Sequence, residues 1–200
     1  MLIAIIAIKI DAYIYVNYSL SLLPIVGVIC LMIAFWAGNK YDNVKFLSEK
    51  DSLTGLYNRR FIDKVLPIFL AQMYRKNEKL SIAILDCDNF KIINDTYGHK
   101  KGDLVLQEFS ALLLTTIRKS DIAARLGGDE FLIIAPYADD KDMEMIIHRF
   151  KTGLQELSEK LQIDLSVSSG FALYPRDAQK IDDLIEFADG KMYGFKDKKE

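Results

Sequence analysis

Two groups of acidic residues stand where the sequence predicts a strand end and a turn. Asp86 lies near the end of the apolar run Leu80–Cys87, and Asp129 and Glu130 directly follow the pair Gly127–Gly128. Divalent cations such as Mg²⁺ prefer carboxylate and carbonyl oxygens and usually share the phosphates of a substrate. If the apolar run is a strand beside the glycine pair, Asp86 and Asp129 converge on one site. These residues therefore point to a metal-bound triphosphate and to phosphoryl transfer.

A simpler interpretation applies to the first acidic group. Asp86 or Asp88 can merely cap a helix that follows the strand, and for a lone aspartate this is the commoner role. The second group shifts the balance, because two adjacent turn acids have little structural purpose. Glycine also leaves the turn open, so that the phosphates of a ligand can approach the backbone closely.

Strands and helices must alternate to position these acids. Short apolar segments on both sides of the glycine pair predict two strands joined by a tight turn with positive φ at its centre. No glycine-rich dinucleotide loop and no P-loop accompanies them. We therefore expect an α/β fold in which helices flank a mainly antiparallel sheet. The predicted strands are Leu80–Cys87, Ile122–Arg125, Glu130–Ala135 and Ile163–Tyr174, and the predicted helices are Phe61–Tyr74, Leu104–Ile117, Asp139–Leu161 and Ile181–Lys196.

Charge and cysteine content exclude some classes of protein. The formal net charge is -2, with both signs mixed, which argues against a protein that binds duplex nucleic acid. The two cysteines, Cys30 and Cys87, lie far apart and form no CxxC pair, so neither a disulfide framework nor a zinc site is expected.

The first 40 residues differ sharply from the rest. No charged residue occurs from Ala12 to Asn39, and Leu20–Ala37 approaches the roughly 20 apolar residues that span a bilayer as a helix. Lysines follow at once, which places the C-terminal side in the cytoplasm. We expect a membrane segment of one or two spans over residues 1–40, a linker over 41–50 and a catalytic domain over 51–200. A cleaved signal peptide and a buried core helix are the alternatives for the apolar segment, and the stretch before it would also suit a strand.

Five ordered motifs resemble one known family. Gly127-Gly128-Asp129-Glu130-Phe131 looks like the signature of GGDEF-domain diguanylate cyclases, and the resemblance extends from Asp51 to Lys196. The other matching motifs are the run from Asp51 to Arg60, the run from Asp86 to Asp103, Arg125, and the run from Ala188 to Tyr193.

The resemblance implies a nucleotidyl cyclase-like fold and a reaction in which two GTP molecules condense into cyclic di-GMP and two pyrophosphates. Because one domain holds one GTP, it implies a homodimer, with Mg²⁺ or Mn²⁺ in each half-site. The implied metal ligands are Asp86, the Cys87 carbonyl and Asp129, with Glu130 as a ligand or proton acceptor. The implied phosphate group is Asn89, Phe90, Lys91 and Lys196, and the implied guanine readers are Asn94 and Asp103.

Several of these residues have a structural alternative. Asn94 can belong to a turn, Asp103 can cap a helix starting at Leu104, and Arg125 can support the glycine turn instead of binding phosphate. Arg118 and Asp121 resemble the inhibitory product site of the family, although such a pair is commonly just a helix-end charge pair.

The C-terminal residues depart from the family pattern. Where family members often continue with a glycine and a basic residue, the chain ends Lys196-Asp197-Lys198-Lys199-Glu200, so that Lys198 or Lys199 would have to supply a second phosphate contact. A catalytically silent domain that binds GTP or cyclic di-GMP is the rival function, and a cyclase using a single substrate is a weaker one. The expected location is the cell inner membrane, with the catalytic domain in the cytoplasm.

Overall fold

The computed structural model describes residues 2–18, 25–36 and 49–196, and the chain forms two compact units, Met1–Phe46 and Leu47–Glu200. The first unit contains helix α1 (Leu2–Tyr18) and a helix over residues 25–36. The segment that also suited a strand is thus helical. Apolar side chains of both helices are exposed.

None of the helices in the described ranges combines the length and apolar character that crossing a bilayer requires. The expected span Leu20–Ala37 includes residues 20–24 and 37, which lie outside the described residues, as does most of the expected linker.

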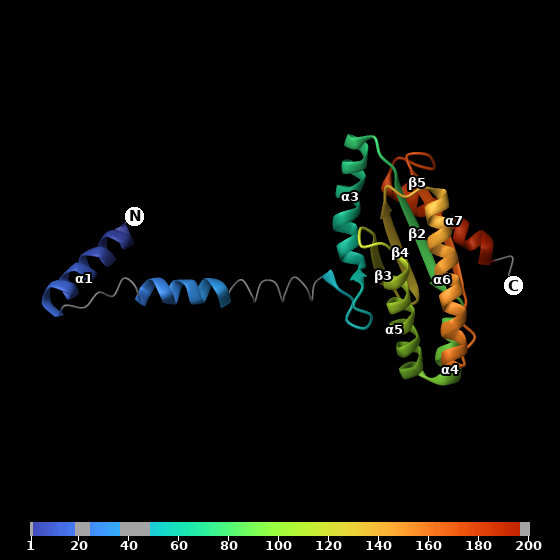
Figure 1. Cartoon of the computed structure of the whole chain (residues 1–200), viewed down its shortest axis with the longest axis horizontal. Coiled ribbons are helices and arrows are strands. Elements are labelled where there is room, and N and C mark those ends of the chain that lie inside the picture. The colour runs from blue at the N-terminus through green and yellow to red at the C-terminus, as the bar shows by residue number, and fades with distance from the viewer. Residues whose placement is uncertain (1, 19–24, 37–48, 197–200) are drawn as a thin grey trace. The chain divides into compact units, whose positions relative to one another are not determined.

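The second unit is an α/β domain built on a five-stranded sheet with the strand order β1-β3-β4-β2-β5 (Figure 1). Its strands are β1 (Tyr57–Asn58), β2 (Leu80–Cys87), β3 (Ile122–Gly127), β4 (Glu130–Pro136) and β5 (Val167–Tyr174). Its helices are α3 (Arg59–Lys76), α4 (Phe90–Tyr97), α5 (His99–Thr116), α6 (Asp140–Leu161) and α7 (Ile181–Lys196).

The sheet is mainly antiparallel, as expected, and one parallel pair that the sequence did not predict makes it mixed. β3–β4, β4–β2 and β2–β5 are antiparallel, whereas β1 runs parallel to β3. β1 has only two residues, Tyr57 and Asn58, and this is too short to produce an alternating pattern in the sequence. Asn58 then caps α3, because its side-chain oxygen accepts a hydrogen bond from the Phe61 N–H at 3.0 Å.

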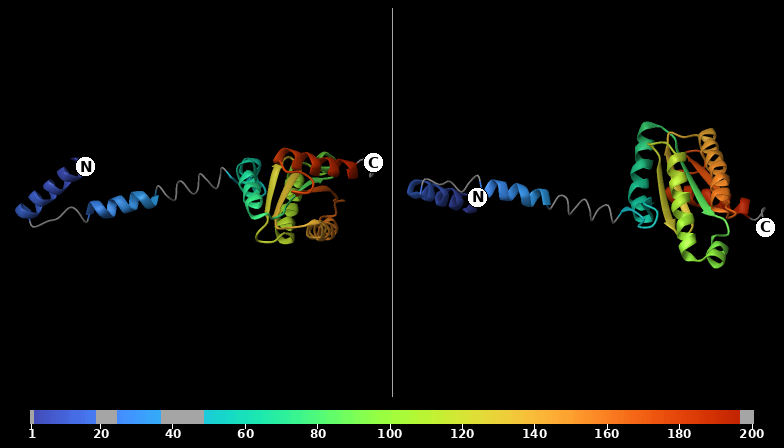
Figure 2. Two further views of the ribbon diagram at one scale, coloured as in Figure 1. Left: turned by 90° about the horizontal axis from the view of Figure 1, so that it is seen from above. Right: turned by 60° about the horizontal axis from the view of Figure 1, so that its bottom comes forward.

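β2 is buried along its whole length because helices cover both faces of the sheet (Figure 2). Its alternate side chains enter two cores. Ala83, Leu85 and Cys87 pack on the side of α5 and α6, where Phe109 stacks on Phe131 and meets Phe150 edge-on. Leu80, Ile82 and Ile84 pack on the side of α3 and α7. The strand therefore reads as a continuous apolar run, and Asp86 interrupts it at the end where the site lies.

Two helices occupy the segment in which the sequence predicted only one. α4 was not predicted, and α5 begins at His99 instead of Leu104. Gly98 separates them with φ 82°, and its N–H donates to the Asn94 carbonyl at 2.9 Å. A backbone with positive φ is open to glycine at little steric cost, so the chain turns there between two helices.

Candidate active site

Asp86 and Glu130 lie directly opposite each other on the neighbouring antiparallel strands β2 and β4. Directly opposed residues have Cβ atoms about 5 Å apart. The Cys87 N–H donates to the Asp129 carbonyl at 3.1 Å and ties the glycine turn to the end of β2. The expected proximity of the strand end and the turn is therefore present. Gly127 and Gly128 both have positive φ, 155° and 53°, as expected for the turn.

The electrostatics of Glu130 reflect a cluster of carboxylates. Burial raises the pKa of Glu130 above its usual value, and the nearby charges of Asp86, Asp129 and Asp189 raise this pKa further. Arg59 acts in the opposite direction. Sequence reasoning assigned no role to Asp189 or Arg59, although both stand within motifs that match the family. An excess of negative charge in one place favours the binding of a cation.

The described residues include no group of three or more His, Cys, Asp or Glu side chains that could hold a metal ion by themselves. Mg²⁺ commonly takes one or two carboxylates and completes its shell with waters and substrate phosphates. The carboxylates of Asp86, Asp129 and Glu130 and the Cys87 carbonyl fit such a substrate-dependent site, because all four offer hard oxygen atoms.

Asp88 has a structural role that the sequence did not indicate. Its two carboxylate oxygens accept hydrogen bonds from the hydroxyls of Ser166 and Ser168, both at 2.6 Å. Its N–H also donates to the Ser166 carbonyl at 3.0 Å. The helix-cap interpretation is wrong for Asp88, which instead fixes the end of β2 to the start of β5.

The predicted phosphate group begins α4. Asn89 precedes the helix with φ 57°, and its side chain makes no capping hydrogen bond. The first N–H groups of a helix have no partner within the helix, so the amides here are available to an anion. Lys91 is exposed, and its side chain makes no hydrogen bond or ion pair with another described residue.

The two predicted guanine readers lie on adjacent helices. Asn94 is half-buried within α4, so the turn interpretation is wrong. Asp103 lies inside α5, which begins four residues earlier at His99, so it cannot cap a helix starting at Leu104. Neither side chain hydrogen bonds to another residue of the described ranges. Both are thus available to a ligand, in contrast to Asp88.

Arg125 supports the glycine turn. Its Nε and Nη2 donate to the Gly128 carbonyl at 2.9 and 2.7 Å, and its Nη1 donates to Asp51 Oδ1 at 3.1 Å. The same Asp51 oxygen accepts from the N–H and the hydroxyl of Thr54, at 2.9 and 2.6 Å. Burial alone would raise the pKa of Asp51, but the hydrogen bonds from Thr54 and Arg125 outweigh it and lower this pKa. Of the two interpretations of Arg125, this geometry favours turn support.

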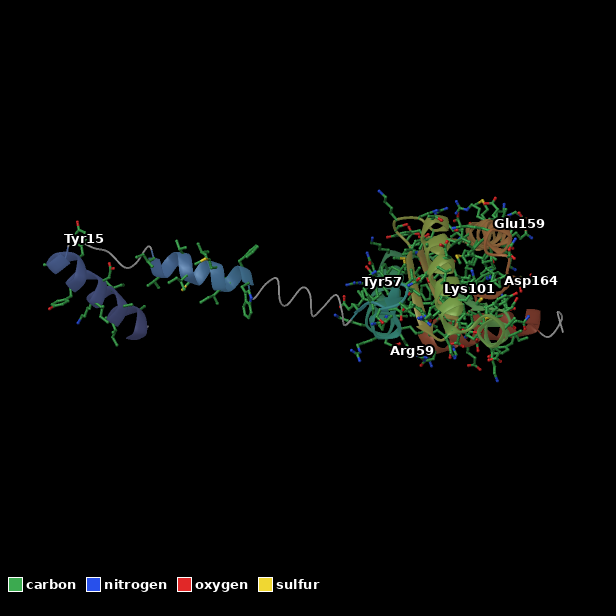
Figure 3. The ribbon with its side chains drawn as sticks, turned by 90° about the horizontal axis from the view of Figure 1, so that it is seen from below. Tyr15, Tyr57, Arg59, Lys101, Glu159 and Asp164 are labelled. Carbon is green, nitrogen blue, oxygen red and sulfur yellow. The ribbon has the colours of Figure 1, made fainter. Side chains whose placement is uncertain are left out.

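A cavity of about 480 Å³ adjoins the turn. Arg59, labelled at the start of α3 in Figure 3, lines this cavity together with Arg60 and Gly128. The Arg59 side chain makes no hydrogen bond or ion pair within the described ranges. A guanidinium in this position can meet an anionic group at the turn.

Comparison with known proteins agrees with this geometry. Residues 48–200 match the family described as "Diguanylate cyclase, GGDEF domain". The chain belongs to the GGDEF domain family.

Relatives of the chain differ in their names and lengths. The diguanylate cyclase TpbB of Pseudomonas aeruginosa is 38% identical, and the match covers 79% of this chain and 38% of TpbB. The cyclic di-GMP phosphodiesterase NbdA of the same species is 32% identical over 74% of this chain and 19% of NbdA. The chain spans about a fifth to about half of the length of the curated relatives that it matches.

A solved structure supports the fold. The coiled coil and GGDEF domain of DgcB from Caulobacter crescentus, crystallised in complex with c-di-GMP, superposes with a TM-score of 0.78 at 25% identity. The match covers 88% of this chain and 95% of that chain.

The predicted product site lies at the end of the GGDEF domain opposite to the glycine turn. Arg118 and Asp121 precede β3, whose far end leads into the glycine turn. From Asp103 to Thr116 the helix α5 extends over about 20 Å. Arg118 and Asp121 form no charge pair with each other, so the helix-end pair interpretation is wrong. Asp121 Oδ2 accepts from the Arg118 N–H at 2.9 Å, and the Arg118 guanidinium pairs with Asp142 at 2.5 Å.

The C-terminal phosphate contacts stay predictions. Lys196 is the last residue of α7, and its side chain lies outside the described residues, as do Lys198 and Lys199.

Proposed function

We propose that the chain is a diguanylate cyclase that condenses two GTP molecules into cyclic di-GMP with release of two pyrophosphates. One observation carries this proposal: the acids Asp86, Asp129 and Glu130 lie together beside a glycine turn. The domain belongs to the GGDEF family, and all five residues of the family signature are present at 127–131. The side chains of Lys91, Asn94 and Asp103 form no hydrogen bond within the described residues, which supports a role toward a ligand.

In the proposed reaction each 3′ oxygen forms a bond to the α-phosphorus of the other GTP. The bond from that phosphorus to the bridging oxygen breaks, and pyrophosphate leaves with the electron pair. Glu130 is the proposed acceptor of the 3′-hydroxyl proton. Because each domain holds one GTP, a homodimer with two-fold symmetry is needed to bring both half-sites together.

Each half-site is proposed to use Mg²⁺ or Mn²⁺. Asp86, the Cys87 carbonyl, Asp129 and Glu130 would hold the ion, which when bound would offset charge on the phosphates. Asn89, Phe90, Lys91 and Lys196 are proposed to bind the β- and γ-phosphates. Asn94 and Asp103 are proposed to read guanine, since a carboxylate accepts from its N1–H and N2–H groups. Arg118 and Asp121 are proposed to bind the product as an inhibitor.

We further propose that residues 1–40 attach the protein to the cell inner membrane, with the catalytic domain in the cytoplasm. The low charge of this segment and the lysines after it support the proposal. The full chain should sediment with membranes and dissolve in detergent, whereas a chain beginning at Tyr41 should not sediment. Sedimentation of both chains alike would contradict the attachment.

A silent receptor for GTP or cyclic di-GMP is the second candidate. It is favoured by the similarity to NbdA, whose name is that of a phosphodiesterase. Incubation of the full chain with GTP and Mg²⁺, followed by mass spectrometry of the products, separates the two. Cyclic di-GMP supports the cyclase, and nucleotide binding without any product supports the receptor.

A further inference from the structure

Gly102 occupies an unusual position in α5. It is buried within the helix, where glycine is among the least favourable residues. A Cβ placed on Gly102 would lie 2.0 Å from Asn94 Oδ1, 3.0 Å from Asn94 Cγ and 3.3 Å from Phe90 Cζ. The Asn94 carboxamide therefore fills the space that any larger residue at position 102 would need.

Other helical glycines differ from Gly102. At Gly190 and Gly194 in α7, nothing lies within 4 Å of such a Cβ. At Gly153 in α6, the Cβ would meet the terminal Cδ1 of Leu112 at 2.6 Å, and that methyl group can move aside. Only at Gly102, among these four, is the neighbour a polar group assigned to the ligand.

The contact determines where the Asn94 side chain lies. No hydrogen bond to another described residue holds this carboxamide, so packing against α5 sets its position. Asp103 is the next residue of α5, and the contact at Gly102 therefore also sets the spacing between Asn94 and Asp103.

We propose that Gly102 is a positioning residue for base specificity, which seats the Asn94 carboxamide so that Asn94 and Asp103 meet one guanine base together. The proposal rests on the proposed function. Guanine offers donors at N1 and N2 to a carboxylate and acceptors at O6, N7 and N3 to an amide. Adenine presents no N1–H and no N2 amino group, so a fixed pair of Asn94 and Asp103 discriminates against it.

The binding test uses the full chain with Mg²⁺ and compares the Kd of GTP, ITP and ATP. ITP lacks the N2 amino group. Gly102→Ala should weaken GTP binding by about tenfold and reduce the preference for GTP over ATP by a similar factor, because a small misplacement loses directional hydrogen bonds. Gly153→Ala is the matched control, since it adds the same methyl group to another helix, and it should leave both values unchanged.

A stability test identifies the group that is displaced. Gly102→Ala should lower the Tm of the full chain in the presence of Asn94. In an Asn94→Ala background the same substitution should raise the Tm by about 2 to 4 °C, because alanine is the better helix former once the carboxamide is gone. A change of the same sign in both backgrounds would overturn the proposal.

The outcomes separate the two proposals. A GTP preference that Gly102→Ala retains in full would overturn the role of Gly102 and leave the proposed function standing. Equal binding of GTP and ATP by the unsubstituted chain would overturn the proposed guanine substrate, while the Tm comparison would still report the contact between Gly102 and Asn94.

Discussion

Arg125 donates two N–H groups to the Gly128 carbonyl, at 2.9 and 2.7 Å. These two hydrogen bonds hold the glycine turn directly before the acids Asp129 and Glu130. Asp51 orients the third nitrogen of the same guanidinium. Arg125 thus connects Asp51, in the first motif of the domain and 74 residues before Arg125, to the glycine turn of the signature.

The first prediction concerns this forked contact. Arg125→Lys should lower turnover by about tenfold or more, because a lysine ammonium cannot make both bonds to one carbonyl in the same geometry. Steady-state rates with GTP and Mg²⁺ measure the effect. Arg75→Ala is the control, because Arg75 lies in the last turn of α3 and makes no contact with the glycine turn. This variant should keep the parent rate. Full activity of Arg125→Lys would show that the turn does not need this support.

Asp51 gives a prediction for pH. Its folded pKa is lowered below the usual 3.8, so its carboxylate stabilises the fold above that value, and the stabilisation is lost as the pH falls through the folded pKa. Asp51→Ala should therefore cost roughly 1 to 2 kcal/mol at pH 7 and much less in strong acid. Asp51→Asn, which keeps an oxygen acceptor, should cost less at neutral pH. Denaturant titrations across the acid range measure this, and a pH-independent difference between Asp51→Ala and the parent would contradict it.

The sequence indicates the site far better than it indicates the supports of the site. Asp86 and the Gly127–Gly128 turn were predictable because strand periodicity and turn glycines are local signals. The partners of Asp88 are not local, since Ser166 and Ser168 lie 78 and 80 residues away and become neighbours only when β5 joins β2. Only packing in three dimensions brings them together.

The helices show the same limit. α4 and its sharp junction with α5 were missed because α4 has eight residues and follows the strand end almost at once. The structural alternatives for Asn94 and Asp103 failed for this reason, because one placed a turn and the other a helix start at positions that lie inside α4 and α5. The close approach of Asn94 to Gly102 could not be read from the motif, because it depends on how two helices pack.

Asp86 and Asp88 provide a matched pair with opposite expectations. Asp88→Ala leaves two serine hydroxyls without their acceptor and should destabilise the domain by roughly 2 to 4 kcal/mol, a fall in Tm of about 5 to 15 °C. Asp86→Ala should instead lower turnover roughly 100-fold or more with a smaller loss of Tm, because it removes a proposed metal ligand. Thermal unfolding and GTP turnover of both variants decide the matter. Near-normal turnover of Asp86→Ala would remove it from the proposed metal site.

Arg118 is the basis of a prediction about feedback. Arg118→Ala should raise the concentration of cyclic di-GMP needed for half inhibition by at least about tenfold, since it removes a bidentate donor to the guanine of the product. The initial rate should stay within about twofold of the parent, because β3 separates Arg118 from the glycine turn. Lys119→Ala removes a neighbouring charge outside the pattern and should be inhibited like the parent. Equal inhibition of Arg118→Ala and the parent would rule the site out.

The last prediction concerns the need for two domains. Every residue proposed to act on GTP lies at or after Asp86, so residues 1–40 are expected to contribute by raising the encounter rate of catalytic domains. Short tethers can raise the effective concentration of two linked domains to about the millimolar range. A chain beginning at Tyr41 should therefore still make cyclic di-GMP, but its specific activity should rise steeply with protein concentration.

Fusion of a dimeric coiled coil in suitable register should restore activity at low concentration, and a monomeric fusion partner of similar size should not. A dilution series of the truncated chain measures this directly. Constant specific activity across dilution, with the protein monomeric throughout, would mean that one domain completes the reaction alone, and the mechanism with two facing half-sites would have to be abandoned.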